Sequence, residues 1–522
     1  MNEFDEQLDQ IASLLNQCAE KLEGDLFDEQ IEIYDLAFSR AELLAAKVIK
    51  ERSKTNSYLE EISNYFCSEV ISNIAGRISR NNNLYDVDPT SLATMTAHQP
   101  YLGSEYVRRL GKRFVEHGIP LEGFDQEKSL MRDTFKSFAD ETVKPLAEQI
   151  HRENLLVPEE ILEPLRQMGV FGLSVPAGFG GLTPDDQEDS LGMVIATEEL
   201  SRGSLGAAGS LITRPEIMAR AILEGGTDAQ KSRWLPGIAK GEPLCAVSVT
   251  EPNTGSDVAS VSLKAAKTEG GWLLNGGKTW CTYAGAAGLI LVLARTEDDE
   301  TLGHRGLSLF VIEKKSYSGE LFELNQGGGG KLSGKAIPTI GYRGMHSFEM
   351  FYDDFFVPDE CLVGEVEGRG RGFYYTMKGF SGGRLQTAAR ACGLMRAAFE
   401  EGVKYTLDRK VFGKAVADYP LSLAKFARMG AYISVCKELT YEVAGLMDKD
   451  EGQIEASLVK LLSCRAAESV TRDALQLFGG MGYAEESAVS RYFVDARVLS
   501  IFEGAEETLA IRVLGKSLLS DR

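Results

Sequence analysis

Residues 498–507, Val-Leu-Ser-Ile-Phe-Glu-Gly-Ala-Glu-Glu, place one carboxylate, Glu503, between an aromatic residue and a glycine. A carboxylate in that position can be half-buried beside a tight backbone, which is where a general base works. The same residues also fit the start of an acidic helix, since Glu503, Glu506 and Glu507 would suit its positive end. On this segment alone both interpretations stay open.

Two segments combine hydroxyl side chains with tight turns. Residues 249–257, Val-Thr-Glu-Pro-Asn-Thr-Gly-Ser-Asp, follow a predicted strand and form either an ordinary turn or a loop that holds a polar ring edge or a phosphate. In residues 278–282, Lys-Thr-Trp-Cys-Thr, which follow the next predicted strand, Trp280 and Thr282 would point the same way. That pair offers a stacking face with a hydrogen bond, or else Trp280 is a half-exposed core residue.

Two further segments close predicted helices. Residues 409–413, Arg-Lys-Val-Phe-Gly, put a rigid cation beside a break, which suits a phosphate or the negative end of a helix. Residues 476–483, Gln-Leu-Phe-Gly-Gly-Met-Gly-Tyr, contain three glycines. One glycine is enough to cap a helix, whereas three allow the backbone to approach a ligand closely.

The elements that must position these segments change type along the chain. Residues 1–118 are predicted to be helical because apolar residues recur there at steps of three or four, as at Leu59, Ile62, Phe66, Val70 and Ile74. Within that region, residues 80–100 are polar, contain two prolines and are predicted to be a linker.

A second helical region is predicted over residues 126–241. Short β-rich runs follow at residues 245–250, 272–274, 289–294, 307–312 and 348–352, with Gly-Gly and Asn-Gly turn signals between them. Long helical runs at residues 384–408, 421–447 and 454–478 then suit an antiparallel bundle.

Composition narrows the class of protein. A chain of 522 residues with 43% apolar and 25% charged residues is typical of a multi-domain globular protein. A net charge of -21 argues against a nucleic-acid or membrane-surface binder, because phosphate attraction needs a positive face. The acidic first residues and the lack of a long apolar run predict no signal peptide and no membrane span. Eight scattered cysteines predict reduced thiols in a cytoplasmic protein, and five dispersed histidines predict no catalytic metal.

Together and in this order, the segments resemble the acyl-CoA dehydrogenase family of flavoproteins. The motifs that carry the resemblance are T-E-P-x-x-G-S-D, K-x-W-x-T, R-x-x-F-G, Q-x-x-G-G-x-G-Y and F-E-G, and it covers residues 124–519. It implies a mainly helical α+β fold with four parts. These are a helical extension (1–118), a helical domain (119–242), a middle β-barrel-like domain (243–360) and a C-terminal four-helix bundle (361–522).

The resemblance implies FAD as the cofactor, and the matching positions imply its contacts. The isoalloxazine with its ribityl and phosphate groups would be surrounded by Val249, Thr250, Gly255, Ser256, Trp280 and Thr282. The adenine half, on a neighbouring subunit, would meet Arg409, Phe412, Gln476, Gly479 and Gly480. Most members have Thr and Gln at flavin-contacting positions where this chain has Ala505 and Glu507.

The resemblance also implies the reaction, which is α,β-dehydrogenation of an acyl-CoA thioester. Glu503 falls on the family's catalytic base, which removes the proton on Cα while a hydride leaves Cβ for the flavin. Arg384 matches an arginine on the helix that lines the active site, and some members take their base from the residue before it, here Gly383. Substrate contacts are implied for Ser256, Arg384 and Gly504. The implied partners are an acyl-CoA, an electron transfer flavoprotein as oxidant, and further copies of the chain in a homodimer or dimer of dimers.

A finer resemblance concerns the acyl group. Residues 198–203, 341–345, 384–390 and 502–505 are similar to the methylsuccinyl-CoA dehydrogenase subgroup, which also carries a long helical N-terminal extension. That subgroup oxidises (2S)-methylsuccinyl-CoA to mesaconyl-CoA in the ethylmalonyl-CoA pathway. Arg214 falls where the acyl tail would end. A buried arginine there would match the substrate's distal carboxylate, or else it forms a salt bridge with Glu216 or at the surface.

Three other functions compete with this interpretation. Two are enzymes: a short-chain, branched-chain or medium-chain acyl-CoA dehydrogenase, and an acyl-CoA oxidase that passes electrons to O₂. The third is a flavin-bearing nucleic-acid-binding protein on the same scaffold. Such a protein would need a basic C-terminal domain, and both the acidic chain and Glu503 argue against it.

Overall fold

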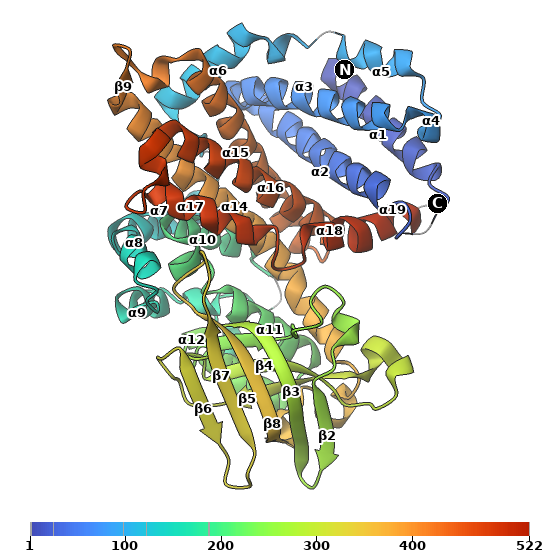
Figure 1. The fold of residues 1–522 in the computed structure, drawn as a ribbon, viewed down its shortest axis with the longest axis vertical. Helices are drawn as coiled ribbons and strands as arrows, with labels where there is room; N and C mark the ends of the chain where they lie inside the picture. The colour runs from blue at the N-terminus through green and yellow to red at the C-terminus, as the bar shows by residue number, and fades with distance from the viewer. Residues whose placement is uncertain (1–2, 25, 98, 122, 186–187, 521–522) are drawn as a thin grey trace. The chain divides into compact units, whose positions relative to one another are not determined.

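The computed structural model describes residues 3–24, 26–97, 99–121, 123–185 and 188–520. The chain forms two compact units (Figure 1). The first unit combines Met1–Leu130 with Thr387–Arg522, and the second is Met131–Gln386. As expected, the fold is mainly helical with one curled mixed sheet. The four-part division of the chain stays a prediction.

The sheet of the second unit has eight strands. They are β1 (Cys245–Ser248), β2 (Lys264–Thr268), β3 (Gly271–Thr282), β4 (Leu289–Arg295), β5 (Leu307–Glu313), β6 (Leu321–Asn325), β7 (Lys331–Ile337) and β8 (Ser347–Pro358). Their spatial order is β1-β4-β2-β3-β8-β7-β6, with β5 also paired to β4. The pairings of β4 with β1 and β2 are parallel, whereas β4 pairs with β5, and β3 with β8, in antiparallel fashion.

Helices cover the apolar face of this sheet. The helices α11 (Thr213–Gly225) and α12 (Asp228–Lys240) share a core with the strands, in which Ile222 and Trp234 pack with residues of β4 and β5. The helices α8 (Lys144–Arg152), α9 (Glu159–Gln167) and α10 (Ser190–Gly203) surround a second core. The predicted helical region over residues 126–241 is therefore confirmed.

The first unit packs N-terminal helices on C-terminal ones. The N-terminal set is α1 (Glu3–Glu20), α2 (Gln30–Arg52), α3 (Ser57–Arg80) and α6 (Ser104–His117). The C-terminal set is the end of α14 (Gly372–Asp408) with α15 (Pro420–Met447), α16 (Gln453–Phe478) and α17 (Ala488–Leu499). The approach of α6 to α15 requires a glycine, because a Cβ on Gly111 would lie 1.9 Å from the carbonyl oxygen of Leu423. The three predicted C-terminal helices are confirmed.

The linker predicted over residues 80–100 is wrong. This segment contains the short helices α4 (Asn82–Tyr85) and α5 (Pro89–Thr96). Asp88 caps α5 by accepting a hydrogen bond from the Thr90 N–H, and Pro89 occupies the first turn, where no donor is needed. Tyr85 and Leu92 are buried. The polar residues therefore cap helices instead of breaking them.

Within the described ranges, no helix is both long enough and apolar enough to cross a membrane. All eight cysteines are buried thiols. Burial raises the pKa of Cys281 and Cys464 to about 11, so these thiols stay protonated at neutral pH.

Candidate functional site

Glu503 lies in a loop between α17 and the short helix α18 (Glu506–Thr508). Its φ angle is 52° and that of Gly504 is 92°, so two successive residues adopt left-handed backbone. Glu503 is half-buried, and its Oε2 is buried without a hydrogen-bond partner among the described residues. The helix-start interpretation therefore fits Glu506 and Glu507 but not Glu503. An unsatisfied buried carboxylate oxygen is costly, and a ligand hydrogen would satisfy it.

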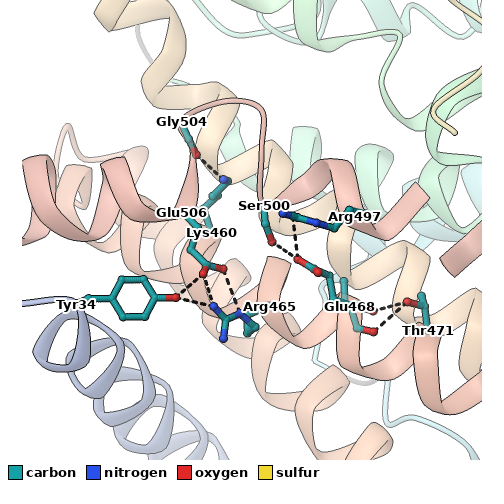
Figure 2. A network of polar contacts seen from close by, with 10 residues as sticks. Tyr34, Lys460, Arg465, Glu468, Thr471, Arg497, Ser500, Gly504 and Glu506 are labelled. Carbon is teal, nitrogen blue, oxygen red and sulfur yellow. Dashed lines mark hydrogen bonds and ion pairs between the residues drawn. The ribbon is translucent and has the colours of Figure 1, made fainter. Parts of the chain in front are cut away.

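Lys460 of α16 supports this loop from below (Figure 2). Its Nζ donates a hydrogen bond of 2.6 Å to the Gly504 carbonyl, and its side chain is buried. Burial lowers the pKa of Lys460, and the nearby negative charges of Glu503 and Glu506 oppose that shift. A buried ammonium group thus lies within electrostatic range of the candidate base.

The loop over residues 249–257 is fixed to β3 by a buried ion pair. Lys278 of β3 donates to the Val249 carbonyl at 2.8 Å and to the Glu251 carboxylate at 2.9 Å. Burial lowers the pKa of Lys278 to about 8, and Glu251 opposes that shift. The Thr279 N–H donates to the Thr250 carbonyl at 2.9 Å. Val249 and Thr250 are thereby held in place, while the loop tip remains exposed at Gly255 and Ser256.

The sequence predicted that Trp280 follows a strand, but in the structure it lies inside β3. The pairing of β3 with β8 shifts register between Lys278 and Cys281, and Trp280 has a φ angle of 57°. This irregularity turns the indole outward, where 56% of the residue is exposed. The Oγ1 of Thr282 lies 2.9 Å from the Oγ of Ser347. Trp280 therefore presents a ring face instead of filling the core.

These residues form a donor set that fits a flavin. The set combines an exposed indole for stacking, threonine and serine hydroxyls, and the exposed backbone of a glycine-containing loop. A Cβ added to Gly255 would meet no atom within 4 Å, so this part of the loop is open to a ligand. All of these groups belong to the second unit.

The R-x-x-F-G segment closes α14, which ends at Asp408, as the sequence predicted, and its remaining residues form a hairpin. The strands β9 (Lys410–Val411) and β10 (Lys414–Ala415) are joined by Phe412 and Gly413, whose φ angles are 49° and 79°. Two positive φ angles are typical of the tight turns that join two strands. Phe412 is 99% exposed at the tip, and Arg409 is exposed beside it.

The glycine-rich segment that follows α16 lies at the same end of the bundle as the hairpin. The rings of Tyr405, near the end of α14, and Phe478, at the end of α16, stack with centroids 4.0 Å apart. Because Arg409 and Gly479 directly follow these two helix ends, the stack brings both motifs together. Exposed residues dominate here, among them Gln476, Gly479, Gly480 and Tyr483, which is 89% exposed.

Arg214 of α11 is buried, with 7% of its surface exposed. Its Nη1 donates to the Ser210 carbonyl at 2.6 Å and lies 3.5 Å from the Sδ of Met345. Its Nη2 donates to the Tyr342 hydroxyl at 2.8 Å. Among the described residues, no carboxylate forms an ion pair with Arg214. Its guanidinium is thus a buried cation whose protein partners are neutral.

The alternative salt bridge between Arg214 and Glu216 is therefore wrong. Glu216 instead accepts from the Nε of Arg220 at 2.9 Å and from the side-chain amide of Gln386. Residues at helix positions two apart point in different directions, so Glu216 cannot face Arg214. Arg384, two residues before Gln386 on α14, is half-buried in the same unit.

Several contributing residues were not identified from the sequence. Tyr342 and Met345 contact Arg214, and their only signal was a place in the Gly-Tyr-Arg-Gly-Met segment. Lys278 was visible only as the first letter of its motif, and Lys460 gave no signal within its helix. Ala505 and Gly504 are half-buried beside Glu503, as their sequence positions require.

This chain is mainly helical, and its curled sheet carries a set of groups that fits a flavin. These features are typical of flavin-dependent oxidoreductases. Family models specify that class. The N-terminal domain of acyl-CoA dehydrogenase matches residues 125–242, its middle domain matches residues 246–355, and its C-terminal domain matches residues 370–519. The chain belongs to the acyl-CoA dehydrogenase family, whose FAD-dependent members act on CH–CH groups.

Individual relatives agree with this assignment. The (2S)-methylsuccinyl-CoA dehydrogenase of Cereibacter sphaeroides is 45% identical over 400 residues, which cover 76% of this chain and 70% of that protein. Butyryl-CoA dehydrogenase from Megasphaera elsdenii is similar in structure, with a TM-score of 0.69 and 28% identity over 77% of this chain and 100% of that chain. A glutaryl-CoA dehydrogenase in complex with glutaryl-CoA has the same TM-score and identity, over 77% and 98% of the two chains.

Proposed function

We propose that this acyl-CoA dehydrogenase oxidises (2S)-methylsuccinyl-CoA to mesaconyl-CoA, a step of the ethylmalonyl-CoA pathway. The observation that carries the proposal is the buried Arg214, whose guanidinium contacts neutral groups. Burying a cation without a counter-charge costs about several kcal/mol of free energy, because the cation loses its hydration. A thioester with a distal carboxylate supplies that counter-charge, and a simple fatty acyl group does not. The 45% identity to a methylsuccinyl-CoA dehydrogenase supports the same substrate.

The base in this proposal is Glu503. Its buried, unsatisfied Oε2 accepts the proton from Cα of the thioester. Its own backbone N–H is a donor for the thioester carbonyl, where negative charge develops as the proton leaves. Bound FAD supplies the acceptor for the hydride that leaves Cβ. Gly504, Ser256 and Arg384 are the further substrate contacts that we propose.

The cofactor contacts are assigned as the family motifs imply. The flavin ring and its ribityl and phosphate groups contact Val249, Thr250, Gly255, Ser256, Trp280, Thr282 and Ala505. The adenine half contacts Arg409, Phe412, Gln476, Gly479 and Gly480 of a neighbouring subunit. The exposure of Phe412 supports this second assignment, because a large exposed ring gains apolar contact when a partner covers it.

The proposed assembly is accordingly a homodimer or a dimer of dimers. The proposed electron acceptor is an electron transfer flavoprotein, by family resemblance. The buried thiols support a cytoplasmic location. The net charge of -21 gives no support to a nucleic-acid partner.

The decisive experiment is anaerobic mixing of the FAD-loaded protein with methylsuccinyl-CoA, followed by stopped-flow absorbance. Rapid loss of the oxidised flavin absorbance is expected with methylsuccinyl-CoA and a much slower loss with butyryl-CoA. The Glu503→Gln variant serves as the control and should keep its absorbance with both. Equal rates for the two thioesters would reject the dicarboxylate substrate, and hydrogen peroxide formed in stoichiometric amounts in air would indicate an oxidase instead.

A further inference from the structure

The loop that carries Glu503 needs support from outside its own backbone. Left-handed φ angles are unfavourable for a residue with a side chain and persist where the surroundings hold them. Glu503 has such an angle, and Gly504 follows with another. The residues that hold the two ends of this loop therefore determine where the Glu503 carboxylate points.

The first end of the loop is held at Ser500 (Figure 2). Its Oγ donates to the Glu468 carboxylate of α16 at 2.5 Å. Its carbonyl accepts the Glu506 N–H at 3.0 Å, so the loop closes on itself. Lys460 holds the middle through the Gly504 carbonyl. These contacts all come from the C-terminal helices.

The second end is held at Glu506, which is 7% exposed. Its Oε2 accepts from the Nε of Arg465 at 3.2 Å, and its Oε1 accepts from Arg465 Nη2 and from the hydroxyl of Tyr34. Arg465 Nη2 also donates to the Tyr34 hydroxyl at 2.5 Å. Figure 2 shows the resulting closed triangle of Tyr34, Arg465 and Glu506. Tyr34 lies on α2, so the N-terminal region reaches the loop directly.

Tyr34 limits the freedom of an otherwise weak ion pair. The Arg465 side chain is 53% exposed, and an ion pair with an exposed partner contributes little by itself. The Tyr34 hydroxyl fixes one end of the guanidinium, and the ring of Phe38 lies 5.0 Å from its centre. Burial and the hydrogen bond to Glu506 raise the pKa of Tyr34, so its hydroxyl remains a donor.

Packing does not replace these polar contacts. Tyr34, Phe38 and Arg465 line a cavity of about 380 Å³ within the first unit. Side chains beside such a cavity have room to move, so hydrogen bonds must fix the positions of Tyr34 and Arg465 against Glu506.

We propose that Tyr34 is a positioning residue for the catalytic base. It orients Glu506, Glu506 anchors the end of the loop, and the loop aims the Glu503 carboxylate. The inference rests on the proposed role of Glu503. It gives α2 of the N-terminal region an indirect part in turnover, through Glu506.

The test compares Tyr34→Phe with a matched control, Tyr58→Phe. Tyr58 lies on α3 and donates to the Gly118 carbonyl at 2.8 Å, so the control removes one hydroxyl bond from the same region without touching the loop. We expect Tyr34→Phe to lower kcat about tenfold with KM within about twofold, because misplacing a catalytic group affects the chemical step more than binding. Tyr58→Phe should match the wild type in both.

A second readout needs neither substrate nor FAD. Hydrogen exchange of the peptide covering residues 500–507, measured on the FAD-free protein, should be about tenfold faster in Tyr34→Phe and unchanged in Tyr58→Phe. In addition, Tyr34→Phe should lower kcat no further when Glu506 is already replaced by Leu, because leucine has no acceptor for the Tyr34 hydroxyl and both changes then break the same contact.

The possible failures are distinct. If Glu503→Gln is inactive but Tyr34→Phe matches Tyr58→Phe in turnover and exchange, the positioning role is refuted and the proposed function stands. If both tyrosine variants lose activity and thermal stability equally, the effect is general destabilisation and the positioning role is again refuted. If Glu503→Gln retains turnover, the proposed function fails and the positioning role fails with it.

Discussion

Arg214→Met tests the substrate assignment most directly. Methionine is unbranched and flexible, so it can follow the path of the arginine side chain beside Met345 and Tyr342 without a large cavity. The change removes the guanidinium that we propose for the distal carboxylate and leaves the neutral groups that contact it.

The expected loss follows from leaving the substrate's carboxylate buried without a partner. Breaking a buried ion pair by removing one member costs about 3–5 kcal/mol. Since about 1.4 kcal/mol corresponds to a factor of ten, kcat/KM for methylsuccinyl-CoA should fall by roughly two to four orders of magnitude. Butyryl-CoA has no distal carboxylate, so its kcat/KM should change by less than about threefold.

Thermal stability without ligand gives an independent check on the same variant. The wild type buries the Arg214 guanidinium among neutral groups, which is unfavourable until a carboxylate arrives. Arg214→Met should therefore melt at the same temperature as the wild type or higher. Steady-state assays with an artificial electron acceptor supply the kinetic values. Equal losses for the two thioesters would place Arg214 outside the acyl pocket and refute the reasoning, as would a large fall in melting temperature.

Three further predictions concern single side chains. Glu503→Gln should remove nearly all turnover, by at least about three orders of magnitude, while FAD content measured by absorbance stays that of the wild type; half the wild-type rate would exclude it as the base. Burial, followed by the charge of Glu42, raises the pKa of Glu69 to about 7 from 4.5. Its protonated form therefore stabilises the fold fully below pH 4.5, and this contribution is lost as the pH rises through 7. Glu69→Gln should match the wild-type melting temperature near pH 5 and exceed it near pH 8; parallel curves would contradict this sign. Phe412→Asn keeps a residue that tolerates a left-handed turn, so the melting temperature of the FAD-free chain should not change, whereas FAD retention and assembly size on gel filtration should fall; full retention of both would remove Phe412 from the subunit contact.

The helices could be predicted from periodic apolar residues, because a helix that buries one face needs an apolar residue at every third or fourth position. All five residues of the repeat that begins at Leu59 lie buried on α3. The strands β2, β6 and β7 lacked a comparable signal, since each of them exposes much of its surface and buries few side chains. The segment over residues 80–100 was misread because capping residues and linker residues are the same polar types.

Candidate site residues could be predicted where several reactive or ligand-binding residue types occur together in one short motif. Glu503, Trp280 and Phe412 each lie in such a motif. The contacts that support them could not be predicted, because they join residues far apart in the chain. Tyr34 and Arg465 are 431 positions apart, and neither is unusual among its neighbours in sequence. The surroundings of Arg214 likewise required three dimensions, because its partners Tyr342 and Met345 lie 128 and 131 positions away in the chain.

The first unit is built from two segments that are far apart in the sequence, and this affects how the chain can fold during its synthesis on the ribosome. Its N-terminal helices are translated early, but the helices that cover their apolar faces emerge only after Met131–Gln386 has been made. At roughly 5–20 residues per second, that intervening stretch of about 250 residues takes some 12–50 s to synthesise. Throughout this interval α2 and α3 can pack on each other, but their faces that contact α15 stay uncovered. Nascent chains of this protein should therefore depend on chaperones that bind unfolded segments more than chains whose domains are contiguous in sequence.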